Sequence, residues 1–146
     1  MKLYLIQHGE SENKDVNPDR PLTARGWEDI KKLSIRLAAV KPAKTYHSGK
    51  LRAKQTAEII ARAKPIEQRA DMNPNDPIDP LVKEIHAVNL DQMIVGHLPF
   101  LSKLACYLLV GNPECNIINF KQGSCLCLER KDSKWSTSFM LTPDIL

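Results

Sequence analysis

The chain has 146 residues, of which 42% are hydrophobic, 26% charged and 5% aromatic, a composition that is ordinary for one compact globular domain. This composition excludes collagen-like, disordered and mini-protein classes, and it predicts a single domain over residues 1–146. The 21 Lys and Arg against 17 Asp and Glu leave a net charge of +4, which is too scattered for a nucleic-acid-binding surface.

The four cysteines do not have the spacing of a metal site or of a CxxC redox site. Two of them, Cys125 and Cys127, share one face of a strand-like run, so we expect buried core thiols. No signal peptide follows Met1, and the longest uncharged apolar stretch, Leu104–Val110, is too short for a membrane span. We therefore expect a reduced, cytoplasmic protein with no membrane partner.

Strand-like and helix-like patterns alternate from the start of the chain. The apolar run Lys2–Gln7 predicts a strand that ends at a glycine turn, and Thr23 is placed to cap the helix that follows. A second strand is predicted at Lys44–Ser48 and a second helix at Lys50–Ala63. The apolar stripe of the first helix, which we expect in the core, comprises Trp27, Ile30, Leu33 and Leu37.

A proline-rich segment interrupts the alternation. Pro65–Pro80 contains four prolines together with Asn and Asp, which favours turns over regular structure. Asp79 is predicted to cap a short helix that has Pro80 at its first position. Gln92–Val95 then predicts a third strand, and a further helix follows it and ends at Gly111.

The tail of the chain changes to a period of two. Short strands are predicted at Ile117–Phe120, Ser124–Leu128 and Lys134–Met140, joined by turns. The alternating strands and helices before them build a parallel sheet that is covered on both faces. The predicted fold class is therefore α/β, a three-layer αβα sandwich with a mostly parallel central sheet and antiparallel C-terminal strands.

Polar side chains follow three of the predicted strands, at the edge where open α/β sheets bind ligands. His8 follows the first strand, Arg52 the second and His97 the third. Each alone has a plain structural interpretation, since His8 could cap a turn and Arg52 could be a solvated helix residue. Together they favour a phosphoryl site, in which one imidazole attacks phosphorus and the other binds the phosphate oxygens.

Four ordered blocks resemble the histidine phosphatase superfamily, which has the phosphoglycerate-mutase-like fold. The blocks are Leu5–Glu10, Arg20–Gly26, Ser48–Ala57 and Val95–Pro99, so the resemblance covers almost the whole chain. The short length and the absence of a large insertion after the second helix are similar to the SixA-type phosphohistidine phosphatases rather than to the larger mutases.

The resemblance implies a two-step transfer that needs no metal and no cofactor. His8 would take the phosphoryl group as a phosphohistidine, which water then cleaves. Arg52 and His97 would bind the phosphate oxygens, with Gln7 and Arg20 as further phosphate-binding residues.

Two features of the sequence leave the mechanism open. Larger relatives protonate the leaving group with an acid, for which Asp76 is the first candidate here and Glu84 the second. Gln7 stands where the superfamily has an arginine, and Gly49 stands where proline is common. The first of these departures replaces a cationic fork with a neutral amide.

Three functions therefore remain open. The first is a phosphatase that acts on phosphohistidine in a protein, such as a phosphotransfer domain in signal transduction. The second is a phosphomonoesterase for small phosphorylated molecules. The third is a pseudophosphatase that binds phosphorylated ligands without turning them over, because Gln7 replaces the usual arginine.

Overall fold

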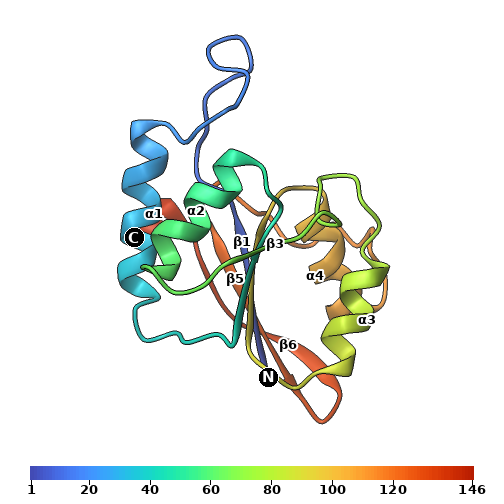
Figure 1. Cartoon of the computed structure of the whole chain (residues 1–146). Coiled ribbons are helices and arrows are strands. Elements are labelled where there is room, and N and C mark those ends of the chain that lie inside the picture. The colour runs from blue at the N-terminus through green and yellow to red at the C-terminus, as the bar shows by residue number, and fades with distance from the viewer.

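The computed structural model describes residues 1–146, which fold around one six-stranded sheet (Figure 1). The strand order is β3-β2-β4-β1-β5-β6. Strands β1 to β4 run parallel, whereas β5 pairs antiparallel with β1, and β6 pairs antiparallel with β5. The strands are β1 (Lys2–Gln7), β2 (Lys44–His47), β3 (Glu67–Gln68), β4 (Gln92–Gly96), β5 (Cys125–Lys131) and β6 (Lys134–Leu141).

Helices cover both faces of the sheet, which confirms the predicted three-layer sandwich. Helices α1 and α2 lie on one face, and α3 and α4 lie on the other (Figure 1). Each pair encloses its own apolar cluster against the sheet, and the side chains of β1 alternate between the two clusters. The helices are α1 (Ala24–Arg36), α2 (Leu51–Ala61), α3 (Asp79–Ala87), α4 (Phe100–Val110) and the 3₁₀ helix η1 (Pro143–Ile145).

The parallel register of β1 and β4 brings two of the predicted site residues together. Gln7 at the end of β1 pairs with Gly96 at the end of β4. The backbone N–H of His8 then donates to the Gly96 carbonyl at 3.1 Å. Because the two strands end side by side, the residues that follow them, His8 and His97, emerge at the same edge of the sheet.

Three predictions about local structure are wrong. Ile117–Phe120 forms no strand, because no neighbouring strand pairs with it and Ile117 is 64% exposed. The Pro65–Pro80 segment is not wholly irregular, since it contains the two-residue strand β3, which pairs with β2. Helix α3 begins at Asp79 with Ile78 in the capping position, so Asp79 lies inside the helix rather than capping it.

Trp27 was expected in the core, and it is exposed instead. Thr23 caps α1 as predicted, because its Oγ1 accepts a hydrogen bond from the Gly26 N–H at 3.0 Å. The buried face of α1 starts at Gly26 and continues through Ile30 and Leu33, which are spaced at helical intervals. Trp27 lies one residue, about 100° around the helix, from Gly26, and this turns its ring toward solvent.

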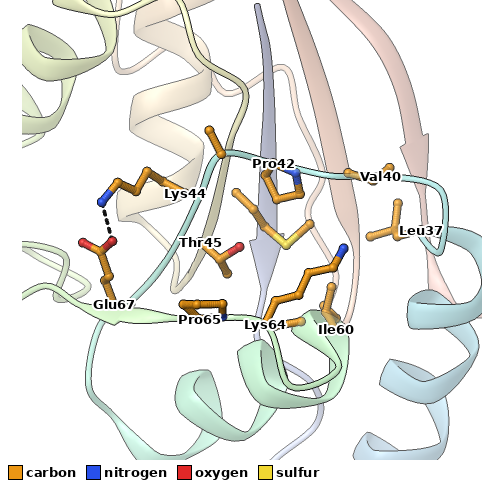
Figure 2. A pocket seen from close by; sticks show the side chains of 12 residues that line it. Leu37, Val40, Pro42, Lys44, Thr45, Ile60, Lys64, Pro65 and Glu67 are labelled. Atoms are coloured by element: carbon orange, nitrogen blue, oxygen red, sulfur yellow. Dashed lines mark hydrogen bonds and ion pairs between the residues drawn. The ribbon is translucent and has the colours of Figure 1, made fainter.

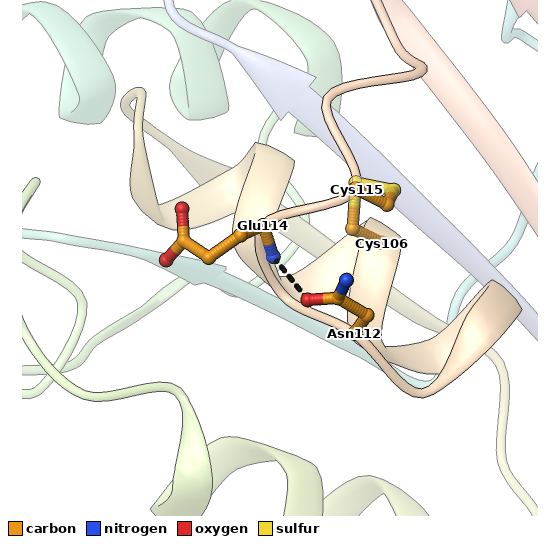
Figure 3. The surroundings of a disulfide bond; sticks show 4 residues. All are labelled: Cys106, Asn112, Glu114 and Cys115. Carbon is orange, nitrogen blue, oxygen red and sulfur yellow. Dashed lines mark hydrogen bonds between the residues drawn. A yellow bond between two sulfur atoms is a disulfide. The ribbon is translucent and has the colours of Figure 1, made fainter.

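The cysteines divide into two pairs. Cys125 and Cys127 are free and buried, as predicted. Cys106 and Cys115 form a disulfide with their Cα atoms 5.7 Å apart, so the expectation of a fully reduced protein is wrong (Figure 3). Gly111 ends α4 in the left-handed conformation, with φ of 72°, and the chain that follows it returns toward the helix. No helix combines the length and the apolar character that crossing a membrane requires.

Candidate active site

His8 is held in one tautomer, with an unprotonated Nε2. Its Nδ1 lies 2.7 Å from the carbonyl oxygen of Gly9, which can only accept, so Nδ1 carries the proton. The other ring nitrogen, Nε2, is therefore unprotonated in the neutral ring and accepts a hydrogen bond from Arg52 Nε at 3.2 Å. The nucleophilic nitrogen of His8, Nε2, therefore points toward the Arg52 guanidinium.

Thr56 connects the segment after His8 to the helix that carries Arg52. Its Oγ1 accepts from the Gly9 N–H at 3.1 Å and donates to the Arg52 carbonyl at 2.8 Å. The hydroxyl is fully buried and uses both its donor and an acceptor. The sequence analysis missed this residue, and its only signal was its place in α2, one helical turn after Arg52.

His97 lies beside His8, with their ring centroids 5.1 Å apart and their planes inclined by 53°. Its Nε2 is 2.5 Å from the Ser48 hydroxyl, whereas its Nδ1 is buried and has no hydrogen-bond partner. Ser48 follows β2, so the ends of three strands contribute to the site as predicted. In the sequence, Ser48 is the last residue of the predicted second strand, with no role assigned to it.

Burial keeps both imidazoles neutral. Desolvation lowers the pKa of His8 to about 4, and the nearby positive charges of Arg52 and Arg20 act in the same direction. Desolvation also lowers the pKa of His97 to about 3, with the charges of His8 and Arg52 adding to the effect. Because the two rings face each other, their protonation is coupled. Near neutral pH the site therefore contains two uncharged imidazoles among cations.

The cations around the histidines come from separate segments. Arg20 lies on the loop before α1, where its Nε donates to the Glu12 carbonyl and its Nη2 to the Ser11 hydroxyl. The charge of Arg20 lowers the pKa of both histidines, and that of Lys50 lowers the pKa of His97. These charges favour an anionic ligand.

Gln7 directly precedes His8 and is buried, and its Oε1 has no hydrogen-bond partner. A 180° rotation of the Gln7 side-chain amide exchanges Oε1 and Nε2 and leaves the rest of the side chain in place. The amide would then present its N–H donors where Oε1 now lies. Arg25, which could have filled the space of the missing arginine, instead lies on the surface 3.9 Å from Asp29.

The two candidate acids are occupied by other contacts. Asp76 accepts a hydrogen bond from the Asn73 N–H at 2.7 Å and closes its own turn. Glu84 pairs with Arg69 and accepts from the Tyr46 hydroxyl at 3.1 Å. No contact links either carboxylate to His8, Arg52 or His97.

The site is shallow and nearly closed. His8 is 5% exposed and His97 is 2% exposed, and none of the surface pockets is lined by His8, Arg52 or His97. The Arg52 guanidinium covers the nucleophilic nitrogen of His8. No group of three or more His, Cys, Asp or Glu side chains is arranged to hold a metal ion.

Comparisons with known proteins bear on the family and the fold. Residues 3–74 match the sequence model of the histidine phosphatase superfamily (branch 1). A search of curated protein sequences finds no match. Many solved structures share the fold at low sequence identity.

Three of these structures cover the chain from end to end. The protein histidine phosphatase SixA complexed with tungstate has a TM-score of 0.85 at 19% identity, with 99% of each chain covered. The α-ribazole phosphatase of Shigella flexneri has a TM-score of 0.80 at 19% identity, covering 98% of this chain and 97% of that one. A phosphoserine phosphatase mutant of Entamoeba histolytica in complex with phosphoserine has a TM-score of 0.78 at 16% identity, covering 99% and 98%.

Proposed function

We propose that this chain of the histidine phosphatase superfamily is a metal-independent phosphatase that uses His8 as its nucleophile. The match of residues 3–74 and the shared fold identify the superfamily. The observation that carries the proposal is the fixed tautomer of His8, whose unprotonated Nε2 faces Arg52 and lies beside His97. A neutral imidazole surrounded by cations is what attack on an anionic phosphoryl group requires.

The reaction proceeds in two displacements. His8 Nε2 attacks phosphorus and forms a P–N bond, while the bond from phosphorus to the leaving group breaks and the leaving group takes up a proton. Water then attacks the phosphohistidine, which releases inorganic phosphate and returns the electron pair to Nε2. Arg52 moves from Nε2 to the phosphate oxygens in the first step, and it stabilises their charge there together with His97.

Two features favour phosphohistidine in a protein as the substrate. Asp76 and Glu84 are engaged in other contacts and neither contacts the site residues, and an imidazole leaving group can take its proton from water on its second nitrogen. The site also lacks the concave pocket that usually encloses a small ligand, whereas a projecting side chain on another protein can reach a shallow site.

The test is phosphate release from a phosphohistidine-carrying phosphotransfer domain. We expect release by the wild type and by His86→Ala, a control on the exposed face of α3, and a loss of about a thousandfold or more in His8→Ala. Equal rates for His8→Ala and the wild type would contradict the proposal. Radiolabel that appears on His8 and then chases to inorganic phosphate would exclude a pseudophosphatase that only binds phosphorylated ligands. A higher kcat/KM on small phosphate esters than on the phosphohistidine protein would favour the phosphomonoesterase.

A further inference from the structure

A second site is formed at the opposite end of β2 from the candidate active site. β3 pairs only with Tyr46 and His47, so Lys44 and Thr45 at the start of β2 have no strand beside them on that side. The space left there is a pocket of about 360 Å³ between the C-terminal ends of α1 and α2. Thr45 lies three residues before Ser48, which is about 10 Å along an extended strand. A ligand here would therefore not occupy the phosphoryl site.

Six of the 12 residues that line the pocket are hydrophobic (Figure 2). Leu37, Ile60 and Met93 contribute aliphatic surface, while the small Ala61 leaves the space open. The volume lies within the range of about 300–1,000 Å³ that is typical of small-molecule sites. Such a pocket accommodates a short aliphatic chain or a single ring.

The polar groups of the pocket include a cation that the protein does not pair. Lys44 pairs with Glu67, whereas the exposed Lys64 ammonium makes no salt bridge. Figure 2 shows Lys64 extended beside Ile60, with its ammonium away from the Lys44–Glu67 pair. Thr45, which is 7% exposed, adds a hydroxyl to the lining. The charged lining side chains Lys44, Lys64 and Glu67 give the pocket a net charge of +1.

The wall that carries Lys64 is held in a strained conformation. Arg62 and Ala63 directly after α2 both have left-handed backbones, with φ of 50° and 68°. Arg62 donates from Nε to the Ser34 hydroxyl and from Nη2 to the Ser34 carbonyl of α1, each at 2.9 Å. Residues in such conformations persist only where surrounding contacts fix them, and binding sites are where they concentrate. Lys64, which directly follows these two residues, lines the pocket.

We propose that this pocket binds a small amphipathic organic anion, with its carboxylate on Lys64 and its apolar body against Ile60 and Met93. The inference goes beyond the proposed phosphatase function and does not depend on it. The net positive lining and the unpaired ammonium select an anion over a neutral or cationic ligand of the same shape. The apolar half of the lining favours a ligand that also has an apolar body over a free phosphate.

The experiment compares three probes of one chain length, octanoate, octanol and octylammonium, by calorimetry and by NMR. We expect octanoate to bind saturably, to shift the Thr45 amide and Met93 methyl signals, and to bind roughly tenfold more tightly than octanol. Lys64→Met should weaken octanoate roughly tenfold and leave octanol unchanged, while Lys32→Met, on the exposed face of α1, should change neither.

A second variant tests the pocket independently of charge. Ala61→Leu should abolish the binding of octanoate and octanol alike, because its side chain fills the space. The proposal is overturned if octanoate fails to shift the pocket signals, if octanol binds as tightly as octanoate, or if Lys64→Met binds octanoate like the wild type. Lys64 is exposed, so its replacement should leave the fold intact and keep these outcomes interpretable.

Discussion

At the scale of single residues, Gln7 departs most clearly from the superfamily's chemistry. Its backbone is fixed by the Ser124 carbonyl and the Gly123 N–H, and its side chain ends in a buried oxygen without a partner. Arg20 is hydrogen-bonded to Ser11 and Glu12, and the exposed Arg25 lies beside Asp29, so neither arginine contacts Gln7. These contacts favour a simple loss of a cation over a rebuilt pocket.

We therefore expect Gln7→Arg to raise kcat/KM by roughly one to two orders of magnitude. The added guanidinium supplies a charge-assisted hydrogen bond to the phosphoryl oxygens, which contributes about 1.5–3 kcal/mol. The measurement is steady-state kinetics beside the wild type. Thr137→Arg, which adds the same charge on the exposed face of β6, should have little effect. An unchanged or lower kcat/KM in Gln7→Arg would show that the pocket has been rebuilt around glutamine.

His8 and His97 make the site insensitive to mild acid. An exposed imidazole has a pKa near 6.5, whereas burial lowers the pKa of His8 to about 4 and that of His97 to about 3. We expect the NMR titration of both rings to show them neutral at about pH 5, with the two midpoints belonging to the coupled pair. A midpoint near 6.5 for either ring would contradict the burial that the structure describes.

The same shifts predict how stability depends on pH. Below about pH 6.5 the unfolded histidines take up protons while the folded ones do not. The free energy of unfolding should therefore be unaffected by these groups above pH 6.5 and fall as the pH drops from 6.5 toward the folded pKa values of about 4 and 3. Replacing His97 with Gln should flatten this part of the stability profile. An equally steep profile in that variant would assign the acid sensitivity to other groups.

At the scale of elements, the close contact between α1 and the loop after β1 fixes the site. A Cβ on Gly26 would lie 2.1 Å from the Glu10 carbonyl oxygen, a backbone atom that cannot rotate away. We expect Gly26→Ala to lower the free energy of unfolding by roughly 2 kcal/mol or more. We also expect kcat/KM to fall, because Glu10 is two residues from His8.

Gly111→Ala provides the matched control for this prediction. Its Cβ would meet nothing within 4 Å, although the left-handed φ of 72° disfavours alanine. The expected loss is only about 1 kcal/mol, with unchanged kcat/KM. Thermal unfolding and kinetics of both variants distinguish the cases. Similar losses in the two would show that helix α1 shifts to relieve the contact.

The elements that the sequence predicts well are those whose signals are local. Thr23 caps α1 through a hydrogen bond three residues away, so its pattern is readable from adjacent positions. β3 is a strand only because β2 pairs with it, and its two exposed polar residues, Glu67 and Gln68, have no strand signal of their own. Trp27 fits a helical stripe, but the contact of Gly26 with Glu10 decides which face is buried.

Across the fold as a whole, one general rule was sufficient to predict which residues meet in the candidate site: open α/β sheets bind ligands at the carboxyl ends of their strands. His8 and His97 follow adjacent parallel strands, so they had to emerge at one edge, and Arg52 reaches the same edge from α2. Ser48 and Thr56 could not be assigned, since their roles depend on distances between segments more than 40 residues apart. The Cys106–Cys115 pair likewise depends on the reversal of the chain at Gly111.

That disulfide joins the buried middle of α4 to the loop that follows it. The two cysteines are 9 positions apart, and closing so short a loop removes conformational entropy from the unfolded chain. We expect reduction to lower the free energy of unfolding by roughly 2–3 kcal/mol. The Tm measured with and without reductant should fall by several degrees in the wild type. Cys115→Ser should unfold like the reduced wild type and should not respond to reductant, because it has no disulfide and its three free thiols, Cys106, Cys125 and Cys127, are buried. A wild type whose Tm ignores reductant would show that the two thiols are unpaired in solution, as the sequence alone had suggested.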